Sequence, residues 1–539
     1  MLFALAGALV TRGLWPSPAA RALTGNPADQ ALSEWFLAYA TRAYRGDFAF
    51  VTGALNAPDG VNLLGNASLI GVGILFAPLT LALGAPVTFA VVAGCNLTAN
   101  ATGWYLLLAR GAGLHRLAAL VGGAFCGFAP GMVSESNGHL HMTAAWLVPP
   151  IVWCATRLNP RKGVLLGALV AGQFFLGEEV LFLAAFTLVL FGLAYAATAR
   201  PRSLARAREA LPGLGIAAAV AGALLAYPLW VQFFGAQAAR GGAFRPEFYS
   251  ADVRSFAAIS PLSLAGGDGA ASLASGPSEY TAFFGAPVLI VALGATVWMW
   301  RRPAVLACTV ASAVLLALSL GPRVGPYALL DGLPVVDRVL PTRFALAAIP
   351  LLAFVLAQAV HAALTQTETL GLLVPVAVVA ALVPLAPLPL PTASRPPVPR
   401  FFAEGYWHGF APRDGTIVPV PLPDAQEPQA LRWAAATGVA FATPQGRFIG
   451  PYGSDGRAAV GIYPRPTALL LRRAVNDGDP PPLTDADRVA LRRDIAYWHA
   501  SCFVLADGQP GAEALKSTLD ALLGPGERVA DVWVWRARG

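Results

Sequence analysis

Few residues in this chain combine a reactive side chain with a setting that would use it, and the first of them is Asp29. It follows a short apolar N-terminal segment and lies near the start of a polar loop that extends to about residue 62. A carboxylate there can take the proton of a hydroxyl group and so act as a general base. The alternative is structural, in which Asp29 only caps a short helix that begins at Gln30. Glu34 is the next acidic residue and the reserve candidate for the base.

Two further groups of polar residues interrupt the apolar part of the chain. Asn137, His139 and His141 lie close together between two apolar segments. Two histidines two positions apart can bind a metal or a phosphate, and the alternative is a polar interfacial turn in which the backbone satisfies His139. Glu178 and Glu179 form a carboxylate pair at a second short turn. They either hold an acceptor or an ion, or simply mark the exposed end of a helical hairpin.

The composition places these residues in a membrane protein. Of the 539 residues, 56% are hydrophobic and 12% are charged, whereas a usual globular chain has about 25% charged residues. The apolar runs are long enough to cross a bilayer several times. The net charge of +7 does not indicate nucleic acid, because the arginines cluster at the ends of the apolar runs. The five cysteines are scattered, so they form neither a disulfide framework nor a CxxC metal motif.

The spacing of the apolar runs predicts about eleven spans. The basic residues between them all fall on one side of the membrane if the segment 63–83 is re-entrant or lies on the outer surface and does not cross. With that assumption the N-terminus is cytoplasmic and the Asp29 loop is outside. Lysine accounts for only Lys162 and Lys516 among 37 basic residues, and this bias favours a GC-rich bacterial genome. The predicted spans are the N-terminal anchor and 85–108, 117–133, 143–156, 163–177, 180–198, 211–234, 281–300, 303–320, 343–360 and 370–388.

The predicted fold class is therefore a mainly α, polytopic membrane helical bundle with a small C-terminal α/β domain outside the cytoplasm. Residues 1–390 form the membrane module, including an outer loop at 12–84, and a proline-rich linker leads to the domain at 391–539. The predicted strands of that domain are 416–420, 501–505 and 528–535. Thr484 and Asp487 resemble a capping box at the start of one helix, and 511–523 forms another.

Several arginines fall on the outer loops, where the orientation rule does not explain them. A guanidinium group matches a phosphate in its fork geometry, so these residues are candidates for binding a phosphorylated substrate. The candidates are Arg240, Arg245, Arg254, Arg338 and Arg343.

Two motifs resemble a known superfamily. The stretch Asn56-Ala57-Pro58-Asp59-Gly60-Val61-Asn62-Leu63, and the stretch 127–133 followed by Asn137 and His139, are similar to actinobacterial membrane proteins of the GT-C glycosyltransferase superfamily. This resemblance implies transfer of a sugar from a polyprenyl-phosphate donor, with Asp29 as the base. Many such proteins have a second acidic residue beside that Asp, in some cases linked to a metal. Here the neighbour is Gln30, so a divalent metal stays open and no metal ligand is assigned.

The sequence thus predicts an inverting membrane glycosyltransferase that acts at the outer face of a bacterial plasma membrane on an envelope glycan or lipid acceptor. One alternative is a transporter or flippase of lipid-linked sugars. That function predicts ionisable residues near the middle of spans and two similar halves, but the spans contain almost no charge and no repeat is visible. The other alternative is a non-catalytic scaffold for envelope assembly.

Overall fold

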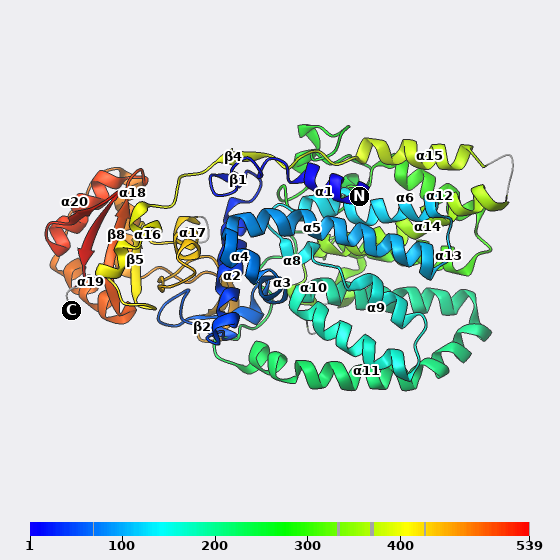
Figure 1. The fold of residues 1–539 in the computed structure, drawn as a ribbon, viewed down its shortest axis with the longest axis horizontal. Helices are drawn as coiled ribbons and strands as arrows, with labels where there is room; N and C mark the ends of the chain where they lie inside the picture. Colours follow the sequence, from blue (N-terminus) through cyan, green and yellow to red (C-terminus); the bar gives the residue numbers. More distant parts are fainter. Residues whose placement is uncertain (68, 331–334, 367–370, 425–426, 538–539) are drawn as a thin grey trace.

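The computed structural model describes residues 1–539 except 68, 331–334, 367–370, 425–426 and 538–539. The side chains of residues 200–207 are also excluded from the description. The molecule is elongated, with a helical bundle at one end and a small α/β unit at the other (Figure 1). The helices of the bundle are α1 (Leu2–Val10), α3 (Ile70–Leu75), α4 (Ala77–Leu83), α5 (Ala85–Leu106), α6 (Arg116–Phe128), α7 (Pro130–Glu135), α8 (Leu140–Thr143), α9 (Val148–Ala155), α10 (Pro160–Thr198), α11 (Arg200–Phe234), α12 (Ala286–Trp298), α13 (Pro303–Ser319), α14 (Phe344–Gln366) and α15 (Leu373–Leu382).

Four stretches of the described chain are long and apolar enough to cross a membrane, namely 116–135, 160–198, 208–234 and 341–366. Crossing the hydrocarbon core takes about 20 helical residues, and α1, with 9 residues, and α9, with 8, are shorter than that. The mainly helical architecture is confirmed, whereas the count of eleven spans stays a prediction. The segment 63–83 forms α3 and α4, each shorter than a crossing, although residue 68 lies outside the described part.

A break in α10 separates two of the predicted spans. Gly177 has an extended backbone, with φ −177° and ψ 99°, inside an otherwise helical stretch. Leu166 and Leu188 lie on opposite sides of this break in sequence, yet both pack in one small apolar cluster with α9 and α11. The chain therefore turns back at Gly177. Glu178 and Glu179 lie at the end of this helical hairpin, where the sequence placed them.

The buried helix α2 (Pro27–Ala40) lies across the end of the bundle, between it and the α/β unit (Figure 1). It starts where it does because the side-chain oxygen of Asn26 accepts a hydrogen bond from the Asp29 N–H at 3.2 Å. Pro27 takes the first helical position, where an N–H would have no partner. The alternative prediction that Asp29 caps a helix beginning at Gln30 is wrong, since Asn26 is the cap and Asp29 lies inside the first turn.

The C-terminal unit is built on a four-stranded sheet with the order β5-β8-β10-β9, in which β5 and β8 are parallel and the other pairs antiparallel. The capping box predicted at Thr484 and Asp487 is confirmed. The segment 528–535, predicted as one strand, is two strands, because the backbone turns at Ala530 with φ 50°. The elements are β5 (Thr416–Val420), α18 (Pro466–Asp477), α19 (Asp485–Trp498), β8 (Ala500–Ala506), α20 (Ala512–Leu523), β9 (Glu527–Val529) and β10 (Val532–Arg536).

The two faces of this sheet belong to different hydrophobic cores. Side chains alternate along a strand, so Val418 and Phe503 pack with α18, α19 and α20. Ile417 and Val504 instead join the large core that includes α2 and the bundle. That core also takes in part of the chain at 400–448, with α16 (Arg400–Ala403) and α17 (Gln429–Ala436). The C-terminal region is thus packed directly on the helix that carries Asp29.

Three short antiparallel pairs complete the path of the chain. The strands β1 (Arg21–Leu23) and β4 (Thr392–Ser394) pair the N-terminal loop with the proline-rich linker. The linker is fastened further by Arg395, which donates to both carboxylate oxygens of Glu34 at 2.8 and 3.1 Å. The other pairs are β2 (Val51–Thr52) with β3 (Val61–Asn62), and β6 (Ile449–Tyr452) with β7 (Arg457–Val460).

Candidate active site

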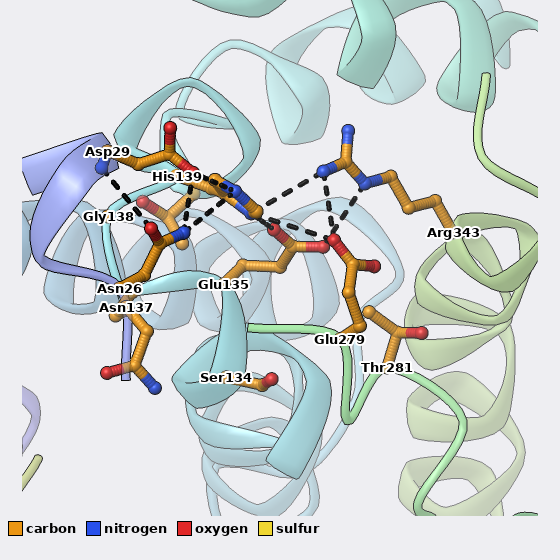
Figure 2. A network of polar contacts seen from close by, with 12 residues as sticks. Asn26, Asp29, Ser134, Glu135, Asn137, Gly138, His139, Glu279, Thr281 and Arg343 are labelled. Atoms are coloured by element: carbon orange, nitrogen blue, oxygen red, sulfur yellow. Dashed lines mark hydrogen bonds and ion pairs between the residues drawn. The ribbon is translucent and has the colours of Figure 1, made fainter. Parts of the chain in front are cut away.

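Both carboxylate oxygens of Asp29 have charged or polar partners. Oδ1 accepts a hydrogen bond from Nε of Arg447 at 2.5 Å. Oδ2 accepts one from the Asn26 amide at 2.5 Å and lies 3.1 Å from Nε2 of His139 (Figure 2). Burial favours the neutral form, but the hydrogen bonds and charges of His139 and Arg447 outweigh it and hold the pKa of Asp29 well below its usual range. Asp29 is therefore an anion at neutral pH.

A tight turn docks the histidine against α2. Gly138 has φ +102°, and a Cβ there would come within 3.0 Å of the Asp29 Cβ. Only glycine combines this left-handed backbone with such a close approach. The hydroxyl of Ser33 donates to the carbonyl of Gly138 at 3.1 Å and fixes the contact from the other side. The position of His139 beside Asp29 thus depends on the residue that precedes it.

His139 bridges two carboxylates. Its Nδ1 lies 2.7 Å from Oε2 of Glu135, and its Nε2 faces Asp29 (Figure 2). Burial opposes a charge on the ring, but the hydrogen bonds and charges of Asp29 and Glu135 raise the pKa of His139 to about 10. His141 lies alongside, with its ring centroid 5.7 Å from that of His139. Burial and the neighbouring charges of His139 and Arg343 lower the pKa of His141, so one ring is a cation and the other is neutral.

Arg343, at the start of α14, gathers carboxylates from three segments. Nη1 donates to Glu179 at 2.6 Å, Nη2 donates to Glu279 at 3.2 Å, and Nε lies 3.6 Å from Glu135. Burial raises the pKa of Glu279 to about 7, although Arg343 acts in the opposite sense. Figure 2 shows the resulting chain of contacts, from Asp29 through His139 and Glu135 to Arg343. The network is continuous and almost entirely buried.

A cavity of about 280 Å³ opens beside this network. Its wall includes Asp29, His139, His141, Glu178, Glu179, Arg338 and Arg343, which are all predicted site residues. Glu178 accepts a hydrogen bond from Gln232 at 2.7 Å. Arg338 donates to the carbonyl of Ala239 at 2.8 Å. The structure therefore brings together seven of the residues proposed from sequence.

Other predicted residues lie outside the lining of this cavity. Glu34 is buried against Arg395, and Asn137 is buried with its amide donating to the carbonyl of Pro277. Arg254 is exposed and paired with Asp252 at 2.6 Å. Arg240 and Arg245 are exposed as well. The sequence predicted that these arginines lie in loops, but it did not indicate whether they line the site.

Three residues of the site received no role in the sequence analysis, namely Glu135, Glu279 and Arg447. Glu135 lies four positions before His139, and that helical spacing was a usable signal. Glu279 stands alone in a long loop, and Arg447 is 418 positions from its partner Asp29. No local pattern marks either of these two residues.

A second, larger cavity lies among the helices. It has a volume of about 780 Å³ and an apolar wall from α5, α9, α10 and α14. At one end Met142 and Val180 line it, directly after His141 and Glu179 of the polar site in sequence. Arg157 lines it as well, from the opposite end of α9. The polar cavity and the apolar one thus take wall residues from the same short segments of the chain.

The fold is similar to that of solved structures. A cryo-EM structure of the arabinofuranosyltransferase AftD from Mycobacteria aligns with a TM-score of 0.55 and 15% identity, over 99% of this chain and 40% of that chain. A mutant form of the same enzyme aligns with a TM-score of 0.57 and 15% identity, over 99% and 41%. The chain therefore shares the fold of the aligned part of these AftD structures.

The extent of the match matters, because this chain spans only about two fifths of the length of the AftD chains. An oligosaccharyltransferase from Archaeoglobus fulgidus in the apo form aligns with a TM-score of 0.45 and 11% identity, over 82% of this chain and 64% of that chain. No family model and no curated protein matches the sequence.

Three residues of the network have the side chains of a metal site. Glu135, His139 and Glu279 bring three potential ligand atoms within 4.8 Å of one another. Arg343, however, already faces both carboxylates, and His139 carries a second positive charge. Because the pKa of Glu279 is about 7, a proton can neutralise much of the remaining negative charge of the carboxylates. Two cations on these ligands leave a divalent ion a poor fit, and no step below uses one.

Proposed function

We propose that this protein is an inverting membrane glycosyltransferase that takes a sugar from a polyprenyl-phosphate donor and transfers it to a glycan or lipid of the bacterial envelope. One observation supports this most strongly. The Asp29 carboxylate lies in a polar cavity that holds cationic side chains, and an apolar cavity among the helices takes wall residues from the same short segments. A lipid-linked sugar has the same division, with an anionic head on an apolar chain.

The chemistry divides between the two cavities. Asp29 accepts the proton of the acceptor hydroxyl while that oxygen bonds to the anomeric carbon of the sugar. The bond from this carbon to the phosphate oxygen breaks, and the lipid phosphate leaves with the electron pair. Attack from the side opposite the leaving group inverts the configuration at the anomeric carbon. Arg343 and Arg338 line the same cavity and stabilise the negative charge that grows on the phosphate.

The apolar cavity is suited to the donor chain. Its volume of about 780 Å³ falls within the usual range of about 300–1,000 Å³ for small-molecule sites. Burial of a polyprenyl chain there is favourable because apolar surface leaves water. Arabinofuranose is the first sugar to test, since the AftD neighbour is an arabinofuranosyltransferase.

The orientation follows from charge. The basic loops favour a cytoplasmic N-terminus, which places α2 and the C-terminal α/β unit outside a bacterial plasma membrane. Gly267 and Gly113 both have open space where a side chain would project. A cysteine at position 267 should react with an impermeant thiol reagent in intact cells, and one at 113 should not. The reverse pattern would place the site on the cytoplasmic side.

The decisive test is Asp29→Asn in purified protein supplied with polyprenyl-phosphate arabinofuranose and related donors. An amide cannot take the hydroxyl proton, so turnover should fall by about 10²–10⁴-fold, or about 3 to 5 kcal/mol of barrier. The helix should persist, because its cap is Asn26. Asp59→Asn is the matched control, since Asp59 is a carboxylate of the same outer loop that bonds to Tyr497 at 2.5 Å. Near-normal turnover by Asp29→Asn would exclude Asp29 as the base.

A flippase of lipid-linked sugars is the second candidate. It is favoured by the extent of the apolar cavity, which has Arg157 and Glu209 in its wall as well as residues beside the polar site. Such a cavity could pass a lipid from one leaflet to the other. Movement of a labelled donor across vesicles that contain Asp29→Asn would support this candidate, because transport needs no base. Sugar transfer without such movement would oppose it.

A further inference from the structure

The contact between Arg447 and Asp29 conflicts with a simple base mechanism. Oδ2 of Asp29 has two donors, Asn26 and His139, so Oδ1 is the oxygen that can receive a proton. Arg447 bonds to this oxygen at 2.5 Å. Proton transfer to Oδ1 must therefore compete with an ion pair that stabilises the deprotonated form.

Arg447 reaches Asp29 from a segment that we call the strap, residues 443–449. The strap is fastened at both ends. At one end the N–H of Thr443 donates to the carbonyl of Ala54 at 3.2 Å, and the carbonyl of Thr443 accepts from the N–H of Ala57 at 3.0 Å. At the other end the N–H of Ile449 donates to Asn66 at 2.7 Å, and the amide of Asn66 donates back at 2.9 Å.

Between these anchors the strap forms one wall of the polar cavity, with Arg447, Phe448 and Ile449 in the lining. Gln445 and Gly446 precede Arg447 and have φ of +60° and +125°. Two consecutive left-handed residues make a sharp bend, which aims the next side chain inward. The side chain of Arg447 is 21% exposed and that of Asp29 is 14% exposed, so the pair borders the cavity and is not sealed inside the core.

The partners of Asp29 differ in what holds them. Asn26 belongs to the cap of α2, and His139 is held from behind by Glu135 at 2.7 Å. Arg447 comes from outside the bundle, on a long side chain with four carbon–carbon or carbon–nitrogen torsions. Of the three, it is the partner that the strap brings to the cavity wall, where its side chain is the more exposed member of the pair with Asp29.

We propose that Arg447 is a positioning residue that withholds the Asp29 base until an acceptor glycan enters the cavity against the strap and takes its place. This inference rests on the proposed glycosyl transfer. In the empty enzyme, water lacks the contacts to displace the guanidinium, so the donor is protected from hydrolysis. In hydrolysis a water oxygen bonds to the anomeric carbon, Asp29 takes a water proton, and the lipid phosphate leaves with the electron pair.

The test measures how donor consumption divides between water and acceptor. Purified full-length protein is given polyprenyl-phosphate arabinofuranose with or without a synthetic arabinofuranosyl oligosaccharide. Without the oligosaccharide, Arg447→Gln should hydrolyse donor about tenfold faster than wild type, because Oδ1 of Asp29 is freed from its ion pair and general-base contributions are typically about 10²–10⁴-fold. With it, the ratio of transfer to hydrolysis should fall. Arg447→Lys should restore most of that ratio, because it keeps the charge.

The control variant comes from β7, the strand that pairs with β6 directly after the strap. Arg457→Gln alters an arginine that is 81% exposed and pairs with Asp455 at 3.1 Å, so both rates should match wild type. If Arg447→Gln lowers hydrolysis and transfer together, Arg447 serves only the structure and the proposal is wrong. If it raises the KM for donor with the ratio unchanged, Arg447 binds the phosphate, and the proposal is again wrong.

A second measurement separates this inference from the proposed function. A water-soluble carbodiimide with a small amine labels carboxyl groups, and peptide mass spectrometry reports the labelling of Asp29. Arg447→Gln should increase that labelling about tenfold, while Arg457→Gln should not change it. If wild type consumes no donor by either route, the proposed function is wrong. The labelling of Asp29 still tests whether Arg447 shields its carboxylate. Equal labelling of Asp29 in wild type and Arg447→Gln would overturn the inference.

Discussion

The walls of the two cavities contain residues that are neighbours in the chain, yet the two cavities are built in opposite ways. His141 and Glu179 line the polar cavity, and the residues that follow them, Met142 and Val180, line the apolar one. The polar cavity is defined by a few directed contacts, each between identifiable atoms. The apolar cavity is defined by shape and by the lack of polar partners. Loss of one side chain should therefore be severe in the first and graded in the second.

The largest effect on stability should come from Arg343→Met. The substitution removes the positive partner of Glu135, Glu179 and Glu279, and an unpaired buried charge costs about 3–5 kcal/mol. A thermal melt in detergent should show a large loss. Arg254→Met is the matched control, since it removes an exposed arginine paired with Asp252, and its melt should not move measurably.

A second substitution sharpens this result. Glu279→Gln in the Arg343→Met background removes one of the carboxylates left without a partner. The double variant should then be more stable than Arg343→Met alone. If the two melt at the same temperature, the cost of losing Arg343 is due to packing and not to unpaired charge.

The apolar cavity should respond to shape. Ala184→Phe places a ring in its wall, whereas Ala185→Phe places the same ring on the exposed side of the same helix. The first variant should raise the KM for a long-chain polyprenyl donor about tenfold and leave a short-chain donor nearly unaffected, since one lost apolar contact group is worth about 1–3 kcal/mol. Equal KM values for the two variants would show that the polyprenyl chain of the donor does not bind in this cavity.

A pH series probes the polar network through His139. Its pKa is about 10 in the folded protein and about 6.5 when unfolded. The stability contributed by the raised pKa is complete below about pH 6.5 and is lost as the pH rises through about 10. The charged or titratable groups that face the ring are Asp29, Glu135, His141, Glu279 and Arg343.

Since Glu279 titrates near 7, the useful window is about pH 8 to 10. Across it the free energy of unfolding of wild type should fall by about 1 kcal/mol per pH unit relative to His139→Gln. Parallel curves for the two proteins would show that His139 is not a cation in the folded state.

The smallest expected effect is that of a chelator. Arg343 and His139 already supply positive charge to Glu135 and Glu279, so dialysis against EDTA should leave donor turnover unchanged within error. Loss of turnover that returns with one added divalent ion would show that the metal belongs to the mechanism after all. Glu279→Gln would then weaken binding of that ion.

Sequence reasoning was most effective where a polar residue stood in an apolar setting. Asp29, His139 and Glu179 could be selected because they are polar residues that interrupt or border apolar segments, and the structure brings them to one cavity. The capping box at Thr484 is a local pattern and was equally readable. These features depend on neighbours within a few residues, so one sequence contains their signal.

The predicted residues outside the cavity wall and the residues that received no role share a different cause. Arg240 and Arg254 were chosen because a charge pattern indicates the side of the membrane, but it does not indicate the distance from a site. The partnership of Glu34 with Arg395 and that of Asp29 with Arg447 join residues 361 and 418 positions apart. Nothing near Arg447 announces its partner, because the pairing is set by how the C-terminal region packs on α2.

That long separation has a consequence during synthesis. At about 5–20 residues per second, a ribosome needs about 20 to 80 s to add the 418 residues between Asp29 and Arg447. For that time α2 lacks the C-terminal chain that packs on it in the folded protein, including α17. A ribosome that stalls after α15 would release a helical bundle with an unguarded Asp29. Synthesis of the last 140 or so residues is thus also the step that supplies Arg447 to Asp29 and completes the packing around α2.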